Sequence, residues 1–320
     1  MMQRNQTRAR VFPRVGVLTV FLVSAGVLIT ACGSGSSSST SGDSTETLDV
    51  RLAFAAQAGD GQPLDGCGSL SGLGTTSSTA DLADFAFYVH DIELIDQSGN
   101  RYPLALNGDS PWQWENVAML DFQDHGDFCK GEAKPTNREV AGQVSDVPEG
   151  ARMTGVAFKV GVPFEYNHWD ASQAPAPLNR PGMFWRWQTG YKFMRLDVEP
   201  VGGVERPDPQ NPRETAIATR WNLHLGSTGC EGDPAAGEPH DCSARNVVDV
   251  VLIGHDVLAE TIVLDYGALV AGNDLSRDEG GPVGCMSGTN DPECGAIFSR
   301  LGLDWDAQGA QGPQSVFFLR

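Results

Sequence analysis

The segment from Gly182 to Asp197 concentrates residue types that can bind a soft metal ion or lose electrons: two tryptophans, two methionines and a tyrosine. Successive side chains of a strand point to opposite faces, so Met183, Trp185 and Trp187 share one face if the run is extended. A thioether beside two indoles fits a core stripe, a soft-metal site or oxidation of an aromatic ring. Residues elsewhere in the chain are needed to decide which of these three roles the segment has.

Two histidines can be placed near this segment. His224 lies in the run Trp221–Leu225, whose apolar residues share one strand face and leave His224 on the other, before a Gly-Ser-Thr-Gly turn. His168 lies in a loop that leads into the tryptophan-rich segment. Each imidazole is a candidate ligand, and each is also explained as a hydrogen-bonded surface or turn residue. We expect His240 in a solvated loop and His90 in a structural position.

Thioether sulfur and imidazole nitrogen together favour a soft ion, and Cu(I) fits this donor set best. Met183 is the thioether closest to the tryptophan pair. Met286 follows Cys285 and is a second candidate, because a small disulfide loop would hold it in place. The alternative is that these methionines fill gaps in the core, which is the commonest use of methionine.

The first 31 residues are predicted to be a secretory signal, since four arginines precede a short apolar stretch. That stretch ends Ile-Thr-Ala-Cys, which resembles a bacterial lipobox, so we expect Cys32 to carry lipid after cleavage. Residues 32–47 are rich in serine and glycine and should form a flexible tether. The protein is therefore expected on the periplasmic side of the cell envelope, held at the outer membrane through its lipid alone.

The charge balance argues against nucleic acid and anionic membrane as partners. The chain has 22 Lys+Arg and 41 Asp+Glu. Loss of the four arginines of the signal leaves 18 basic and 41 acidic residues, a formal net charge of −23. Such a surface repels nucleic acid and anionic membrane.

Six cysteines remain beyond the lipid site, an even number in an exported protein, so disulfides are expected. Close spacing favours Cys230–Cys242 and Cys285–Cys294, which leaves Cys67–Cys129. Sequence alone allows other pairings. A thiolate metal site is the alternative, but the chain contains no Cys-x-x-Cys.

Short runs of β-forming residues separated by Pro/Gly/Asp-rich loops recur along the chain after the tether. Residues 48–320 are therefore predicted to form one mainly β domain, an antiparallel sandwich or barrel-like fold with long disulfide-tied loops and few short helices. Short helices are expected at 265–271 and 292–302. The predicted strands are Leu48–Phe54, Phe85–Ile95, Thr154–Val162, Phe184–Val198, Arg220–Leu225, Val247–Ile253, Thr261–Leu264 and Val316–Leu319.

The usual signatures of catalysis are missing from the sequence. It contains no Gly-x-Ser-x-Gly, phosphate loop, dinucleotide fingerprint or His-Glu-x-x-His. Hydrolase and nucleotide chemistry are unsupported, and we expect a binding protein rather than an enzyme.

In their order, the motifs of the chain resemble the MbnP family, the methanobactin-associated periplasmic copper proteins, also called metallo-mystery-pair four-cysteine-motif proteins. The resemblance runs from about Leu48 to the C-terminus. It is carried by Pro163-Phe164, Asn167-His168, Pro175-x-Pro177-Leu178-Asn179, Met183-Phe184-Trp185-x-Trp187-Gln188, Gly190-Tyr191-Lys192-Phe193 and His224-Leu225-Gly226-Ser227-Thr228-Gly229-Cys230.

The resemblance implies a protein that binds one copper ion as Cu(I). It also implies a partner, a di-haem cytochrome of the MauG and cytochrome c peroxidase superfamily, which oxidises the first tryptophan of a Trp-x-Trp motif to kynurenine. That residue would be Trp185, with the copper bound there by a histidine, a methionine and solvent. We favour His224 and Met183 as ligands, with His168 and Met286 in reserve. Trp187 and Tyr191 are expected to lie next to the site.

Two other readings of the chain remain. In the first, the aromatic strand belongs to a β-sandwich recognition module that binds carbohydrate or protein without metal, and Trp185 stays chemically intact. In the second, the acidic domain is stabilised by calcium at loops such as Asn273-Asp274 and Asp304–Asp306, although these loops lack the spaced carboxylates of a calcium loop.

Overall fold

The computed structural model describes most of the chain after the predicted tether. The described residues are 44–126, 128–185, 190–232, 241–306 and 312–320. The predicted signal, Cys32, Trp187 and His240 lie outside them. Within these ranges, no helix is long and apolar enough to cross a membrane.

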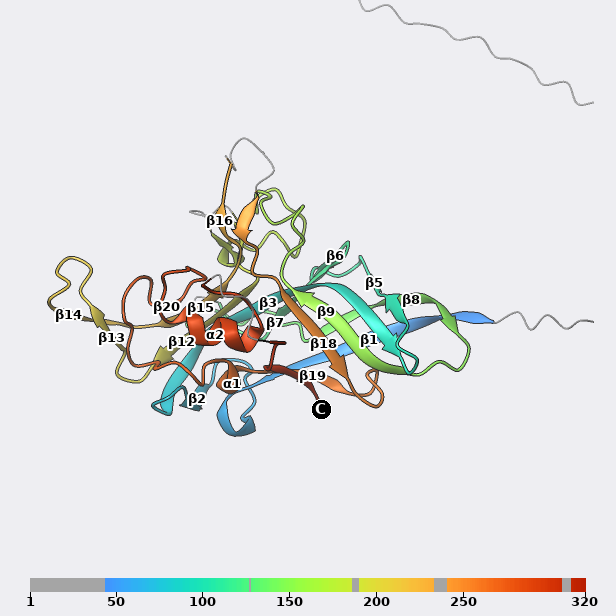
Figure 1. Cartoon of the computed structure of the whole chain (residues 1–320), viewed down its shortest axis with the longest axis horizontal. Coiled ribbons are helices and arrows are strands. Elements are labelled where there is room, and N and C mark those ends of the chain that lie inside the picture. Colours follow the sequence, from blue (N-terminus) through green and yellow to red (C-terminus); the bar gives the residue numbers. More distant parts are fainter. Residues whose placement is uncertain (1–43, 127, 186–189, 233–240, 307–311) are drawn as a thin grey trace, which may run out of the picture. The chain divides into compact units, whose positions relative to one another are not determined.

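A five-stranded sheet has the strand order β21-β19-β1-β8-β5 (Figure 1). Its longest strand, β1, alternates as the sequence predicts: Val50, Leu52 and Phe54 are buried, while Arg51 and Ala53 are exposed. The neighbour β8 runs antiparallel to β1, whereas β19 runs parallel to it. The bounds are β1 Thr45–Gln57, β5 Ala105–Leu106, β8 Glu139–Pro148, β19 Thr261–Asp265 and β21 Phe317–Leu319.

A ten-stranded sheet is built around the long strand β3 (Ser78–Asp96), and its main path is β18-β9-β3-β12-β15-β20. Strands β2, β4 and β7 also pair with β3, and β6 pairs with β7. The last pair, β15–β20, is parallel. The other bounds are β2 Ser69–Leu73, β4 Arg101–Pro103, β6 Gln113–Trp114, β7 Val117–Asp121, β9 Met153–Val160, β12 Met194–Pro200, β15 Trp221–Leu225, β18 Val248–Ile253 and β20 Gly284–Cys285.

Aromatic side chains join the two sheets into a sandwich. The Phe54 ring from the five-stranded sheet packs edge-on against Phe87 and Phe158 of the other sheet, at centroid distances of 6.3 and 5.8 Å. Phe317 packs on the same two rings. The prediction of a mainly β sandwich is confirmed. The pairing is mostly antiparallel, with β1–β19 and β15–β20 as parallel exceptions that short local patterns do not encode.

The predicted single strand Phe184–Val198 is wrong in its continuity. Met183 ends a 3-10 helix, η2 (Pro181–Met183), and β10 (Phe184–Trp185) pairs with β11 (Gly190–Tyr191) before β12 begins. Met183 therefore lies outside the strand that carries Trp185, and the facing expected for Trp187 lies outside the described residues. Proline at the first position of η2 favours the helical turn that places Met183 before the first strand and not within it.

Small elements and disulfides complete the unit. Two further hairpins are β13–β14 (Val204–Pro207 and Thr215–Ala218), which extends from the left edge in Figure 1, and β16–β17 (Thr228–Cys230 and Cys242–Ala244). The helices are η1 Gly59–Gly61, α1 Tyr266–Leu269 and α2 Cys294–Leu301. Both predicted short helices are thus present. The disulfides are Cys67–Cys129, Cys230–Cys242 and Cys285–Cys294, as predicted.

Candidate metal centre

Trp185 lies against the end of β15 and is only 4% exposed. Its ring centroid is 6.4 Å from that of His224, with the planes tilted by 51°. The indole also covers Gly226: a Cβ at that position would lie 2.5 Å from the Trp185 Cζ3 atom and 2.7 Å from the backbone oxygen of Tyr191. Glycine is therefore required at position 226, because any side chain would displace the indole or the backbone that carries it.

His224 is held by a buried carboxylate. In the antiparallel pair β12–β15, His224 lies opposite Arg195, on the sheet face that also carries Asp197. The His224 Nε2 atom is 2.8 Å from Asp197 Oδ1, and the Arg195 Nε–H donates to Asp197 Oδ2 at 2.8 Å. The second ring nitrogen, His224 Nδ1, is buried and has no hydrogen-bond partner. The sequence-based prediction that His224 points away from the apolar stripe agrees with this arrangement.

Burial and charge set the protonation states of this pair. Burial lowers the pKa of His224 despite the nearby Asp197 carboxylate. Burial works to raise the pKa of Asp197, but His224 and Arg195 outweigh it, so that pKa is lowered. Asp197 is then a carboxylate and His224 a neutral imidazole whose Nε2–H donates to it. That tautomer leaves a lone pair on Nδ1. In carboxylate–histidine–metal arrangements, the metal binds the ring nitrogen that is not bonded to the carboxylate, which is Nδ1 here.

The segment before Trp185 is fastened to the same sheet face. The Gly182 carbonyl oxygen accepts hydrogen bonds from Lys192 Nζ at 2.8 Å and from Arg195 Nη1 at 3.4 Å. The Lys192 amide donates to the Met183 carbonyl oxygen at 2.8 Å. Met183 is buried and packs in the main apolar cluster. Its position two residues before Trp185 is thus anchored by backbone and side-chain contacts on both sides.

The parallel pair β15–β20 brings the chain around Met286 to His224. Ser287 Oγ donates to the His224 carbonyl oxygen at 2.9 Å and accepts from the Gly226 amide at 3.1 Å. Met286, the residue before it, is half-buried. The sequence suggested Met286 as a second thioether but did not reveal the strand pairing that places it here.

His168 lies against the β10–β11 pair, on the face to which Trp185 and its cross-strand partner Gly190 point. Its ring is 3.5 Å from the Cβ that Gly190 would carry, and Gly190 is the residue opposite Trp185. The Cys242 sulfur is 3.5 Å from His168 Nε2. His168, Cys230 and Cys242 form a cluster of potential ligands, but the two sulfurs share a disulfide and are not thiolates. A second cluster, Cys67 with Asp124 and His125, has the same limitation.

Tyr191 forms the inner wall of the site. It is fully buried, stacks edge-on against Phe184 and Tyr88, and its amide donates to the Asn167 carbonyl oxygen at 3.1 Å. Burial raises the pKa of its hydroxyl well above the ordinary value. Tyr191 was expected next to the site, and its backbone oxygen lies beside Gly226, whereas Trp187 falls outside the described residues. Asp197 and Ser287 were not singled out from the sequence, because their roles depend on strand register, and Gly226 was named only as part of a turn and a motif.

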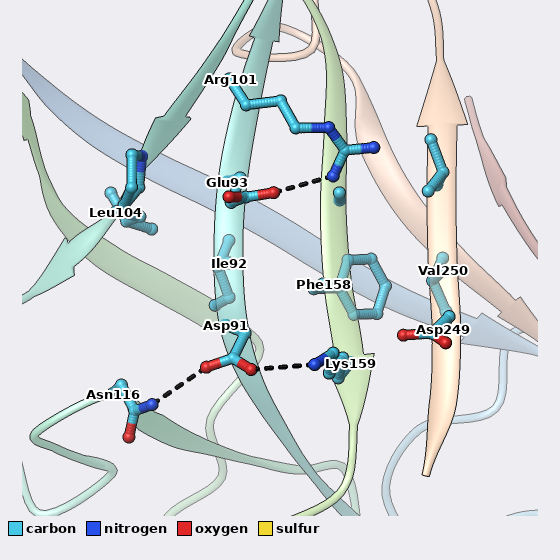
Figure 2. Close-up of a pocket in the computed structure, with 13 residues that line it drawn as sticks. Asp91, Ile92, Glu93, Arg101, Leu104, Asn116, Phe158, Lys159, Asp249 and Val250 are labelled. Atoms are coloured by element: carbon cyan, nitrogen blue, oxygen red, sulfur yellow. Dashed lines mark hydrogen bonds and ion pairs between the residues drawn. The ribbon is translucent and has the colours of Figure 1, made fainter. Parts of the chain in front are cut away.

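A separate pocket of about 600 Å³ lies across strands β3, β4, β9 and β18 of the large sheet. Figure 2 shows that Asp91 there contacts Lys159 and Asn116, and that Glu93 pairs with Arg101. These four charged side chains therefore already have partners. The pocket contains neither Trp185 nor His224, so it is distinct from the site described above.

The comparisons with known proteins decide the family. A family model described as MbnP matches residues 47–287, a range that contains every candidate ligand. The chain belongs to the MbnP family. Among solved structures, MbnP from Methylosinus trichosporium is similar at 34% identity and a TM-score of 0.75, covering 86% of this chain and 98% of that one. No curated protein sequence matches the chain.

Membership of the MbnP family suggests a copper-related role for this chain. The three disulfides and the family together are consistent with an extracytoplasmic protein. Copper binding is also chemically compatible with the site, because the buried Nδ1 atom of His224 lacks a partner and Met183 lies in the adjacent segment.

Proposed function

We propose that this protein binds one copper ion, as Cu(I), at the centre around Trp185 and His224. The observation that carries the proposal is the buried, unpartnered Nδ1 atom of His224 on an imidazole oriented by Asp197 and lying beside the Trp185 ring. His224 and Met183 are the favoured ligands, with His168 and Met286 as the alternatives. A neutral imidazole and thioethers in a buried site are donors that suit Cu(I).

Copper retention depends, in this proposal, on oxidation of Trp185 to kynurenine by a di-haem partner of the MauG and cytochrome c peroxidase type. In this step the partner's haems, with peroxide as oxidant, remove four electrons from the indole, the C2–C3 bond breaks with addition of oxygen, and hydrolysis releases the C2 carbon as formate. An aromatic amine and a ketone are left beside His224. Trp185 is 4% exposed, so its electrons would leave through neighbouring groups at the interface and not by direct contact with a haem.

The cellular role that follows is copper homeostasis by a binding protein that is not itself an enzyme. We place the protein on the periplasmic side of the envelope, anchored at the outer membrane by lipid on Cys32. Support for this placement comes from the signal and tether pattern in the sequence and from the three disulfides, which form in an oxidising compartment.

Peptide mapping of the protein from cells that make the haem partner tests the proposal most directly. Trypsin cuts after Arg186 and so places Trp185 and Trp187 on different peptides. We expect the loss of one carbon and the gain of one oxygen on the Trp185 peptide alone. An unmodified Trp185 in such cells would overturn the proposal and leave a metal-free recognition module as the better account.

A histidine comparison tests the ligand assignment. We expect His224→Ala to weaken copper binding by at least about tenfold, because it removes the oriented Nδ1 donor. His240→Ala and His125→Ala should leave the affinity unchanged, since His240 was expected in a solvated loop and the His125 ring is hydrogen-bonded to Asp124, near the Cys67–Cys129 disulfide and not near Trp185. Competition with a Cu(I) chelator measures all three affinities. Equal losses in the three variants would count against His224 as the ligand.

A further inference from the structure

A second group of buried oxygen atoms lies away from the Trp185 side chain, between the end of α1 and the start of α2. It consists of Asn273, Asp291 and Glu293, which are 6%, 3% and 6% exposed. Each of the three has one side-chain atom that is hydrogen-bonded. Asn273 Nδ2 donates to the Glu293 carbonyl oxygen at 2.8 Å, the Met286 amide donates to Asp291 Oδ2 at 3.0 Å, and the Glu279 amide donates to Glu293 Oε1 at 2.7 Å.

The remaining oxygen of each side chain has no partner. Asn273 Oδ1, Asp291 Oδ1 and Glu293 Oε2 are all buried without a hydrogen-bond donor. Buried polar atoms are nearly always satisfied, and leaving one unsatisfied costs about 1–3 kcal/mol, more for a charged group. The three side chains are neighbours, since Asn273 is bonded to the Glu293 backbone and the Asp291 and Glu293 carboxyl groups are within hydrogen-bond reach. Their unsatisfied oxygens therefore call for a bound species that accepts their lone pairs.

The surroundings favour a cation. A cavity of about 160 Å³ is lined by Asn273 and Glu293 together with Asp274, Glu279 and one cation, Arg277. This space borders Asn273 and Glu293 but not Asp291, so it adjoins one side of the cluster. Asp278, 1% exposed, adds a further negative charge close to Glu293 and Asp291.

We propose that Asn273, Asp291 and Glu293 bind a hard divalent cation, and that this cation is Ca²⁺. Two carboxylate oxygens and an amide oxygen form an all-oxygen donor set, which suits calcium and not a soft ion such as Cu(I). Water in the adjacent cavity completes the six to eight oxygens that calcium takes. The site does not depend on the copper proposal, because it uses different residues and different chemistry.

A proton shared between Asp291 and Glu293 is the competing explanation. Burial raises the pKa of Asp291 to about 7, and the two carboxyl groups are close enough to form a hydrogen bond. A shared proton, however, satisfies only the two carboxyl oxygens. It leaves Asn273 Oδ1 without a partner, and the hydrogen bond from Nδ2 to Glu293 fixes which way this amide points. A cation satisfies all three oxygens.

The site is tied to the centre around His224. Asp291 holds the Met286 amide, and the next residue, Ser287, contacts both His224 and Gly226. A cation that draws Asp291 and Glu293 together therefore fixes the turn that supports the other site. From the sequence, calcium was considered only at the loop Asn273-Asp274, because the ligands of the site proposed here come from two segments and follow no loop spacing.

Terbium(III) luminescence tests the proposal, because Tb³⁺ replaces Ca²⁺ and emits when a nearby tryptophan is excited. Trp305 is the tryptophan that would absorb the exciting light and pass the energy to Tb³⁺. Its indole N–H donates to the Gly288 carbonyl oxygen at 2.9 Å, and its ring packs on Gly295; these two glycines flank Asp291 and Glu293 in the sequence. We expect saturable emission from one Tb³⁺ per chain, displaced by Ca²⁺. Ca²⁺ should also raise the Tm of wild-type protein by a few degrees relative to protein in EDTA.

Near-isosteric variants locate the ion. Glu293→Gln and Asp291→Asn should each weaken Ca²⁺ competition at least tenfold, while Asp249→Asn, an exposed acid on β18, should not change it. A wild-type Tm that does not respond to Ca²⁺, or equal Tb³⁺ affinities in Glu293→Gln and Asp249→Asn, would overturn the proposal. Those results would leave the shared proton as the explanation. The response of the wild-type Tm to Ca²⁺ tests the proposal without any variant, so the test remains decisive even where a variant fails to fold.

Discussion

Replacing Trp185 with phenylalanine is expected to abolish copper retention without unfolding the protein. Phenylalanine cannot be opened to kynurenine, so neither the amine nor the ketone forms beside His224. The fold should persist because Phe is smaller than Trp and still packs on Gly226, and Trp185 lies outside the aromatic contacts that join the two sheets. The measurement is copper per chain after gel filtration of protein made together with the haem partner.

Trp112→Phe is the matched control for this experiment. Trp112 begins the other Trp-x-Trp of the chain, and its ring stacks under the Arg180 guanidinium at 4.7 Å. We read that motif as structural, so the control should retain its full copper content. Circular dichroism and thermal melting establish that both variants are folded. Full copper occupancy in well-folded Trp185→Phe protein would refute the role of Trp185.

Asp197→Asn is expected to destabilise the protein by about 3–5 kcal/mol, the cost of removing one partner from a buried ion pair. Asp197 is 1% exposed and accepts from both Arg195 and His224, so the substitution leaves a buried guanidinium with only Asp84 as counter-charge. Urea unfolding measures the change. Copper affinity should also fall, by about 10–100-fold, because the imidazole loses the carboxylate that orients it.

Asp65→Asn is the control for charge removal at the surface. Asp65 pairs with Arg138 at 2.9 Å, but both side chains are exposed, and such pairs contribute about 0–1 kcal/mol. If Asp197→Asn and Asp65→Asn unfold at the same urea concentration, the buried network is not what holds this part of the sheet together.

Patterns within short stretches of sequence predicted the features that depend on interactions within those stretches. The alternation in β1, the two short helices and the disulfide pairing follow from side-chain period, loop length and composition. The same alternation placed His224 off the apolar face, which the pairing with Arg195 confirms. These features require no knowledge of which strands are neighbours.

Features that depend on distant pairing could not be predicted in this way. Asp197 reaches His224 only because β12 and β15 pair in one register, and Ser287 reaches His224 only through a parallel pair. The antiparallel pairing of β10 with β11 was missed because the residues of both strands favour a single extended run. The oxygen cluster at Asn273 and Glu293 was missed for a related reason, since its ligands are twenty residues apart.

The disulfide Cys285–Cys294 encloses Met286, Ser287 and Asp291, and it ends one residue after Glu293. Under the two metal proposals, this short covalent ring carries residues assigned to both sites. Oxidation of the two thiols closes the ring and restrains the turn that holds these residues. We therefore expect thiol oxidation to precede tight metal binding, so that a chain whose thiols are still reduced, as in the cytoplasm, would capture metal less well.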